Sequence, residues 1–524
     1  MVTRVKKIQI FAQQYLFQKT YTFNESNDRI MSTRHSFQQI LAWCVLSAFL
    51  ITVAKAQDGD IRRIDGSRIP SPEVDRTVSR LMKAADVTGA GIAIFNHGKL
   101  TYLKAYGFRD VQKNLPLTVD SVMSAASFSK VASAYLVMKL VDDRMMDLDR
   151  PVYQYLPKPL PEYPRYGDLA NDERYKRITA RMLLSHTSGF PNWRWFEDDR
   201  KLRIHLEPGS RFAYSGEGID LLQLVVETIT KEPLDALMRE RVFTPLGMTH
   251  TSMIWEDRFE NDFSNGYDEY GRSLGHKTWK SADAAGSMLT TPHDFALFLQ
   301  AVMEGRGLSR KARAEMLSQQ IQIKSKHEFP SLNEETTDEN RAIRLSYGLG
   351  WGLYWTPYGE VFFKEGHDDG WRNYAACFDK LKSGIVIMTN SSNGEGIFKE
   401  LLETLLKNTY TPIEWEGYTP YDKLPPRPPL KQHRTVSVDP KLLDHYAGRY
   451  EVPPNIVLTV RREGDHLSIQ ENDEPKQDLM PESDTDFFST ASDDQLTFQV
   501  DPDGRVPQMI LHVDGKDIAV KRVE

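Results

Sequence analysis

Ser127 and Lys130 form the only Ser-x-x-Lys sequence in the chain, and they stand at the start of a helical pattern at residues 131–140. Side chains three residues apart on a helix share a face, so the Lys130 amine can lie beside the Ser127 hydroxyl and help to remove its proton. The start of the helix would add a positive field and free N–H groups. A chain this long should contain about one or two such sequences by chance, so the alternative is an exposed serine and a solvated lysine.

Two later segments could supply further groups to the same site. Residues 207–218 form a turn-rich approach to a helical pattern, and their Tyr214 could act as a general base or acid if Lys130 and a second cation lowered its pKa. Residues 364–372 begin with Lys364 and contain Gly366, whose missing side chain would let a substrate approach the edge of a strand.

In this order, the three segments resemble the signature of the serine β-lactamase and penicillin-binding-protein superfamily. That signature is Ser-x-x-Lys, then Tyr-x-Asn, then Lys or His-x-Gly. Residues 178–191, 244–248, 285–287 with 291–292, and 347–351 also resemble phrases of its class C and esterase-like branch. The resemblance covers residues 70–410 and implies an antiparallel sheet packed by helices, with a helical lobe and the site in the cleft between them.

The resemblance also implies a reaction and the residues that perform it. Ser127 would attack an acyl carbonyl and form an acyl-enzyme, which water then hydrolyses. Lys130 and Tyr214 would pass the serine proton to the leaving group, and Lys364 would support an ionised Tyr214 or bind a substrate anion. The backbone N–H groups of Ser127 and His367 would form the oxyanion hole. The family chemistry requires no metal and no other cofactor.

The chain leaves the family pattern at positions expected to contact the substrate. Gly216 replaces the asparagine of Tyr-x-Asn, and Glu365, before Gly366, would place a carboxylate where the carboxylate of a β-lactam usually binds. A peptidase or esterase acting on D-amino-acid peptides, amides or small esters is therefore at least as plausible as a β-lactamase. The basic residue of the third motif is open between Lys364 and His367, and the spacing to the following Gly-Trp-Arg favours Lys364.

The altered motifs also allow a second class of function, a catalytically silent receptor that binds peptidoglycan fragments or β-lactams. Retention of the serine, lysine and tyrosine argues against it. His186 is interpreted as a structural turn residue. Asp368 and Asp369 are interpreted as a solvated turn, because no partner has the spacing of a metal ligand.

At 524 residues the chain is too long for one ordinary domain, which indicates two domains. Its hydrophobic residues, 40% of the chain, are enough to form substantial cores. The formal charge of -7 and the absence of a Lys/Arg block make nucleic acid an unexpected partner. The expected partner is a small-molecule or peptide acyl substrate.

The first residues are interpreted as targeting sequence rather than as folded structure. Residues 31–56 have the form of a signal peptide, with a basic start at Met31, an apolar stretch at 40–54 and an A-x-A site that ends at Ala56. Residues 1–30 would then be an upstream extension, and the protein would be periplasmic or secreted, without a stable membrane anchor after cleavage. An uncleaved anchor is the alternative, although the apolar stretch is shorter than the roughly 20 residues of a spanning helix. Cleavage would remove Cys44 and leave Cys377, which is expected to pack in a strand.

The rest of the chain is expected to be α/β (α+β), with three parts. Residues 57–410 would form the hydrolase domain, with one sheet assembled from an early hairpin (91–95 and 99–105) and a late one (373–378 and 385–389), and with helices at 131–141, 221–229, 234–241 and 292–303. Residues 411–440 are Pro-rich and predict an extended linker. Residues 441–524 carry six short strand patterns, which indicate a small antiparallel barrel or sandwich and resemble a lipocalin-like accessory domain.

Overall fold

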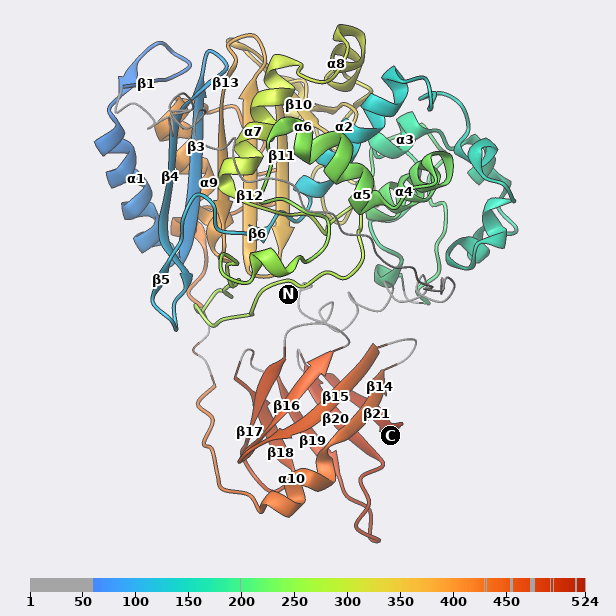
Figure 1. Cartoon of the computed structure of the whole chain (residues 1–524), viewed down its shortest axis with the longest axis vertical. Coiled ribbons are helices and arrows are strands. Elements are labelled where there is room, and N and C mark those ends of the chain that lie inside the picture. The colour runs from blue at the N-terminus through green and yellow to red at the C-terminus, as the bar shows by residue number, and fades with distance from the viewer. Residues whose placement is uncertain are drawn as a thin grey trace, which may run out of the picture.

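The computed structural model describes residues 60–523, except for 198, 428, 430, 453–455, 472–475, 491, 493, 514 and 515. The predicted upstream extension and signal peptide therefore lie outside the described residues. Figure 1 shows a large part in which helices surround a sheet, and a separate β-barrel formed by the end of the chain. Within the described residues, no helix has the length and apolar character needed to span a membrane.

The large part is built on a nine-stranded antiparallel sheet, and the two ends of this part meet in its middle. β3 pairs with β13, and Ile92 lies opposite Ile387, so the early and late strands join as the sequence predicts. In spatial order the strands are β5 (Leu115–Pro116), β4 (Lys99–Asp110), β3 (Gly89–Asn96), β13 (Ser383–Thr389), β12 (Trp371–Phe378), β11 (Gly359–Asp368), β10 (Gly352–Thr356), β9 (Ser346–Tyr347) and β8 (Ile321–Gln322).

Both faces of the sheet are buried, which explains why its central strands are apolar on both sides. In β3, Ala93 and Phe95 face one hydrophobic core, and Ile92 and Ile94 face the other. Helices α2 and α7 pack on the first face, and α1 and α9 cover the second (Figure 1). The helices of this part are α1 (Ser71–Ala84), α2 (Phe128–Asp142), α3 (Ala180–Leu184), α4 (Gly216–Thr230), α5 (Leu234–Met238), α6 (Thr244–Leu246), α7 (Pro292–Glu304), α8 (Arg310–Met316) and α9 (Phe398–Leu401).

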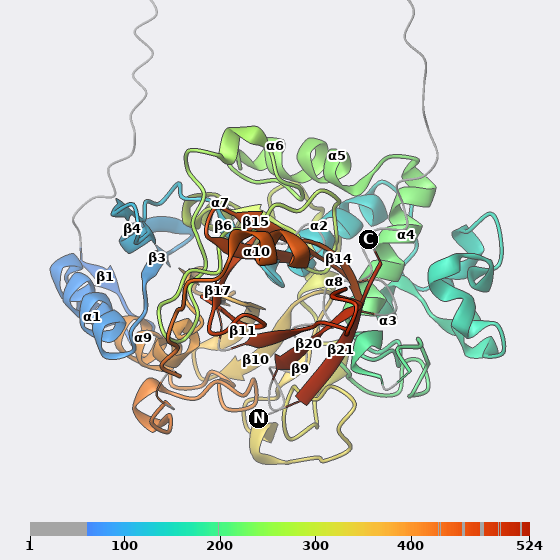
Figure 2. The ribbon, with the colours of Figure 1, turned by 90° about the horizontal axis from the view of Figure 1, so that it is seen from below.

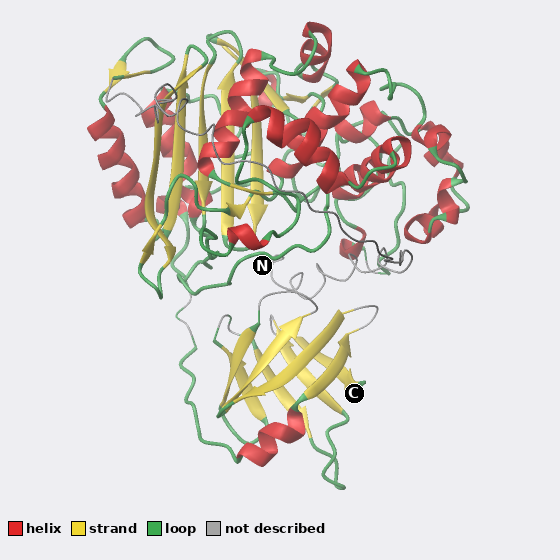
Figure 3. Cartoon of the chain, viewed as in Figure 1, coloured by secondary structure: helices red, strands yellow, loops and turns green. Residues whose placement is uncertain are grey.

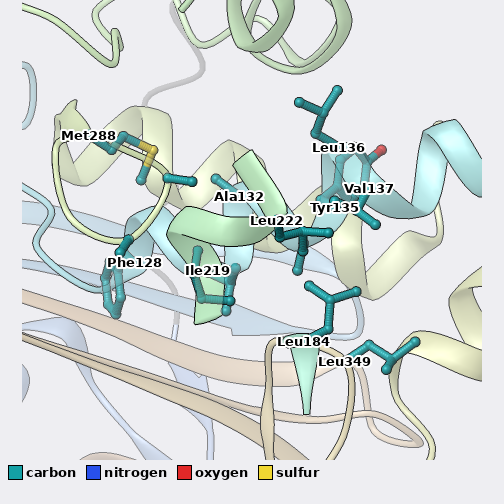
Figure 4. Close-up of a cluster of buried hydrophobic side chains, with 14 of the residues drawn as sticks. Phe128, Ala132, Tyr135, Leu136, Val137, Leu184, Ile219, Leu222, Met288 and Leu349 are labelled. Carbon is teal, nitrogen blue, oxygen red and sulfur yellow. The ribbon is translucent and has the colours of Figure 1, made fainter. Parts of the chain in front are cut away.

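Helix α2 runs through the interior between the sheet and the helical lobe. Most of its side chains are buried, and its apolar residues lie on all sides rather than along one stripe. Figure 4 shows side chains of α2 packed among residues from the lobe and from the loops that follow it, namely Phe128, Ala132, Tyr135, Leu136, Val137, Leu184, Ile219, Leu222, Met288 and Leu349. Ser127, directly before α2, is therefore attached to one of the most firmly packed elements of the protein.

The third motif lies on a strand that the sequence analysis did not predict. Residues 364–368 belong to β11, which pairs with β12 through the turn at 369–370, whereas they were expected at the start of the β12–β13 hairpin. The adjacent charges of Lys364 and Glu365 concealed the strand, because buried strands normally read as apolar runs. Both side chains are nonetheless buried.

The first residues of the predicted linker are packed rather than extended. Ile413, Trp415 and Tyr418 are buried in the core beneath the sheet, together with residues of α1 and α9. Glu416, between them, is also buried. Glu416 and Tyr418 of this segment line the same cavity as Glu365.

The end of the chain forms a closed, eight-stranded antiparallel barrel, as the sequence predicts for an all-β domain. The sequence analysis did not predict two of the strands. Charged residues interrupt the apolar pattern of β14, and β17 contains polar residues and a proline. Helix α10 (Pro440–Tyr446) covers one end of the barrel (Figures 2 and 3), and its Tyr446 ring stacks on Phe498 at 4.2 Å. The strands are β14 (Gly448–Val452), β15 (Ile456–Glu463), β16 (His466–Glu471), β17 (Gln477–Pro481), β18 (Asp486–Ser489), β19 (Gln495–Gln499), β20 (Gln508–Val513) and β21 (Lys516–Arg522).

Candidate active site

Ser127 lies at the junction between the short strand β6 (Met123–Ser124) and α2. Ala126, directly before it, adopts a left-handed conformation with φ of 48°, which turns the chain sharply at this point. The backbone N–H of Ser127 donates no hydrogen bond to any described residue. It is therefore free to bind a ligand oxygen in the cavity that Ser127 lines.

Gly366 permits the β11 strand to approach this junction. A Cβ atom at Gly366 would lie 2.8 Å from the Ala125 carbonyl oxygen, so only glycine fits there. The close approach at this glycine is to the chain itself, whereas the sequence analysis expected a substrate.

Lys130 lies on the first turn of α2 with its amine beside Ser127. Its Nζ is 3.1 Å from Ser127 Oγ and 2.7 Å from the Ala285 carbonyl oxygen, and its side chain is buried. Burial, together with repulsion from the Lys364 charge, lowers the pKa of Lys130 to about 8. In the amine form, one N–H can donate to Ala285 while the lone pair accepts the Ser127 proton.

Tyr214 and Lys364 form the second half of the site. Lys364 Nζ donates to the Tyr214 hydroxyl at 3.0 Å, and it also contacts the Glu365 carboxylate. Lys130 Nζ lies 5.1 Å from the centre of the Tyr214 ring. The serine, both lysines and the tyrosine of the three motifs are therefore brought together.

The pKa of Tyr214 is shifted opposite to the direction that the sequence analysis required. Burial, and then the charges of Glu365 and Glu328, raise the pKa of Tyr214 well above 10. In the unliganded protein Tyr214 is a phenol that can donate a proton, rather than a phenolate.

The structure separates the two candidates for the basic residue of the third motif. Lys364 contacts Tyr214, whereas the His367 side chain is exposed and lies 3.5 Å from Glu395. β11 pairs with β12 along one edge and with β10 along the other, but the pairing with β10 ends at Phe363. Residues 364–368 therefore have no described strand on the β10 edge. His367 thus contributes to this open edge through its backbone.

His186 supports the Tyr214 segment from behind. Its ring lies 4.3 Å from that of Tyr214, and its Nδ1 accepts a hydrogen bond from the Ser215 N–H at 3.2 Å. Burial lowers the pKa of His186 well below 6.5, so the ring is neutral. These contacts agree with a structural role.

Gly216 is required because Trp193 occupies the space that a side chain would need. A Cβ atom at Gly216 would lie 2.2 Å from Trp193 Cη2. The Gly216 N–H donates to Asn192, through both its backbone oxygen and Oδ1. An indole thus stands where the family asparagine would project. Sequence analysis missed Trp193 and Asn192, because their importance depends on a glycine more than twenty residues away.

Replacing Gly216 by alanine should destabilise the protein by about 1–3 kcal/mol, since the methyl group overpacks the site or displaces Trp193. Thermal unfolding followed by tryptophan fluorescence would measure both effects. Gly218→Ala is the control, because its Cβ would lie 3.3 Å from the nearest atom, against 2.2 Å at Gly216, and should therefore cost less. Equal melting temperatures for the two variants would contradict the assignment.

These groups face a cavity of about 470 Å³. Its wall includes aromatic side chains from several loops, among them Trp193, Trp195, Trp279, Phe329 and Tyr418. Asp368 and Asp369 line the cavity, at the end of β11 and in the turn that follows it, and both are partly exposed. Asp368 also accepts a hydrogen bond from Ser124 Oγ at 2.9 Å. No described group of three or more His, Cys, Asp or Glu residues is arranged to hold a metal. The carboxyl side chains of the wall are those of Asp220, Asp283, Glu365, Asp368, Asp369, Glu395 and Glu416.

A model of the β-lactamase family matches residues 74–407, which is well over half of the chain and includes all three motifs. The chain belongs to the β-lactamase family. A second model, a domain of unknown function (DUF3471), matches residues 432–522, the region of the barrel. The superfamily prediction is therefore confirmed for the larger part of this β-lactamase family protein, and the barrel is present after it.

Two curated proteins are similar to this β-lactamase family member at low identity. Protein flp of Staphylococcus aureus (strain NCTC 8325 / PS 47) is 22% identical over 333 residues, which are 61% of this chain and 62% of flp. The chain thus spans about three fifths of that relative. Penicillin-binding protein 4* of Bacillus subtilis (strain 168) is 22% identical over 459 residues, covering 80% of this chain and 92% of that protein.

Solved structures show the same fold. An octameric penicillin-binding protein homologue from Pyrococcus abyssi superposes with a TM-score of 0.54 at 19% identity, covering 86% of this chain and 100% of that one. The D-alanine carboxypeptidase AmpC from Burkholderia cenocepacia gives a TM-score of 0.50 at 22% identity, covering 61% and 93%. At these identities the likeness establishes the fold alone.

Proposed function

We propose that the protein is a serine hydrolase that cleaves an amide or ester through an acyl-enzyme on Ser127. The observation that carries this proposal is the distance of 3.1 Å between Ser127 Oγ and Lys130 Nζ, at a lysine whose pKa is lowered to about 8. A buried amine with such a pKa is a competent general base near neutral pH.

The proposed reaction moves one proton around the site. Lys130 accepts the Ser127 proton as Oγ bonds to the carbonyl carbon, and the backbone N–H groups of Ser127 and His367 stabilise the oxyanion. Tyr214 gives its proton to the leaving group as the bond to that group breaks, and Lys130 restores the Tyr214 proton. Water then attacks the ester, releases the acid and returns a proton to Ser127. Lys364 stabilises the oxygen of Tyr214 while it is without its proton.

The test is labelling of the full chain with a fluorophosphonate, followed by mass spectrometry, together with hydrolysis of p-nitrophenyl acetate. A label on Ser127 and steady turnover support the proposal. A label elsewhere, or none, would overturn it.

The receptor alternative is favoured by one observation, the contact between Glu365 and Lys364, which weakens the cation beside Tyr214. A receptor would be acylated once and would remain acylated. Rapid mixing with p-nitrophenyl acetate separates the two functions, since a receptor releases one equivalent of nitrophenol and then stops.

The acylation rate should rise with pH and level off above about pH 8 if Lys130 is the general base. The pKa of Lys130 is lowered to about 8, so protonation removes the base below this value and the free amine predominates above it. The measurement is the rate constant of Ser127 labelling between about pH 6 and pH 10. A rate that is constant over this range would exclude Lys130 as the base.

We also propose that residues 31–56 direct export and are then removed. The basic start, the apolar stretch and the A-x-A site support this. Sequencing the N-terminus of the protein from cell-envelope and culture fractions should then find Gln57 first. A mature protein that begins at Met1 in the envelope would contradict both the cleavage and the upstream extension.

A further inference from the structure

Seven carboxyl side chains line the cavity around Ser127, and four of them are paired with a cation in or behind its wall. Asp220 contacts Arg165, Glu365 contacts Lys364, Asp368 lies 3.5 Å from Lys277, and Glu395 lies 2.7 Å from Arg372.

Glu416 differs from these paired carboxyl groups. Its side chain is 5% exposed, it lines the cavity, and neither of its carboxyl oxygens has a hydrogen-bond partner among the described residues. Glu328, whose charge interacts with that of Glu416, is 2% exposed and also has no hydrogen-bond partner at either carboxyl oxygen. Buried polar groups are nearly always hydrogen-bonded. The Tyr374 hydroxyl lies near Glu416 and lowers its pKa, but it forms no hydrogen bond with it, so the two carboxyl groups can still accept a further donor.

Burial, and then the charge of Glu365, raise the pKa of Glu416 well above its usual range. The carboxyl group thus retains its proton while the cavity is empty. A cation beside it would favour the ionised form, which is what a nearby opposite charge does to any acid.

The aromatic wall defines what kind of cation fits. Trp193, Trp279, Phe329 and Tyr418 line the same cavity, and aromatic faces attract organic ammonium groups. A hydrated metal ion would gain nothing from these rings. The cavity therefore suits an ammonium group carried on an organic molecule.

We propose that the substrates are cationic acyl compounds, esters or amides whose ammonium group binds beside Glu416 while Ser127 attacks their carbonyl carbon. This inference rests on the hydrolase function proposed above and adds the charge of its substrate. The same carboxyl groups repel anionic acyl compounds.

The first experiment uses the unmodified full chain. Choline and its neutral isostere 3,3-dimethylbutan-1-ol are compared as protectants of Ser127 against a neutral fluorophosphonate, with succinate as the anionic probe. Choline should protect at a concentration at least tenfold lower than the isostere, and succinate should not protect. Equal protection by choline and its isostere would overturn the inference.

The second experiment measures turnover of two matched pairs. One is acetylthiocholine with 3,3-dimethylbutyl thioacetate, and the other is the p-nitrophenyl esters of 6-aminohexanoate and hexanoate. We expect at least a tenfold preference in kcat/KM for the cationic member of one pair. Equal values in both pairs, while Ser127 is still labelled, would overturn the inference alone. A failure to label Ser127 would instead overturn the hydrolase function.

The variants Glu416→Gln and Glu414→Gln assign the preference to a residue. Glu414 is exposed and pairs with Lys399, so its replacement is the matched control two residues away. The ratio of cationic to neutral turnover should fall towards one in Glu416→Gln and should stay at the wild-type value in Glu414→Gln. An unchanged ratio in Glu416→Gln would show that Glu416 does not bind the ammonium group.

Discussion

Ser127→Ala should lose hydrolytic activity by at least about a thousandfold, because the proposed mechanism forms the acyl bond on the Ser127 hydroxyl. Lys130 and the proposed oxyanion donors would remain, so only a small residual rate from a positioned water is expected. The measurement is kcat/KM for p-nitrophenyl acetate, with the intact mass after fluorophosphonate treatment. Ser127→Ala should give no labelled mass.

Ser133→Ala is the control for this loss. Ser133 lies on α2, which begins directly after Ser127. It is buried and donates to the Ala284 carbonyl oxygen at 3.1 Å, away from the cavity wall. It should retain turnover and labelling. Full activity in Ser127→Ala would show that the nucleophile is elsewhere.

Arg194→Met should destabilise the protein by about 3 kcal/mol, since it leaves the Glu217 carboxylate buried with less compensation. Arg194 donates to both Glu217 oxygens, at 2.9 and 2.7 Å, and Glu217 is wholly buried at the start of α4. The Arg165 guanidinium remains 3.4 Å from a Glu217 carboxyl oxygen. The expected loss of unfolding free energy is therefore near the lower end of the range for a broken buried ion pair. Urea denaturation at neutral pH would measure it.

The pH dependence of this loss identifies its cause. Burial raises the pKa of Glu217, but the Arg165 charge and the Arg194 hydrogen bonds outweigh it, so the pKa lies below the ordinary value of 4.5. The ion pair therefore contributes stability above pH 4.5 and loses it as the pH falls through the lowered pKa. The difference between the variant and the wild type should shrink in acid.

Two further variants complete the test. Arg203→Met removes an exposed arginine that pairs with Asp199, and it should leave the urea midpoint nearly unchanged. Adding Glu217→Met to Arg194→Met should restore much of the stability, because no buried charge is left without a partner. A double variant as unstable as Arg194→Met would show that lost packing, rather than charge, is responsible.

The sequence predicted the elements whose local pattern matches their surroundings. The strands around Ile92 and Ile387 read as apolar runs because both of their faces are buried, and the Ser127 helix carries its own motif. The sequence segments that resemble the family showed which residues form the site and in what order they occur. Strand β11 was missed because Lys364 and Glu365 read as exposed charges, whereas they are buried and contact each other.

The chemical state of the site was harder to predict than its members. The pKa of Tyr214 depends on Glu365 and Glu328, and Glu328 lies in a loop with no recognisable motif. Trp193 at Gly216 and Glu416 in the cavity wall likewise reach the site only through tertiary folding. Such groups have no local sequence signature, because what matters is how they are buried together.

The pairing of β3 with β13 has a consequence for how the protein is made. The chain is synthesised from its N-terminus, so β3 must wait for almost 300 further residues before its partner strand emerges. Until then its edge is open to other chains, and Ser127 and Lys130 exist without Tyr214 or Lys364 held against them. Long-range pairing of this kind slows folding and exposes the chain to aggregation. We therefore expect the nascent protein to be inactive, and most exposed to aggregation, until residue 389 has left the exit tunnel of the ribosome.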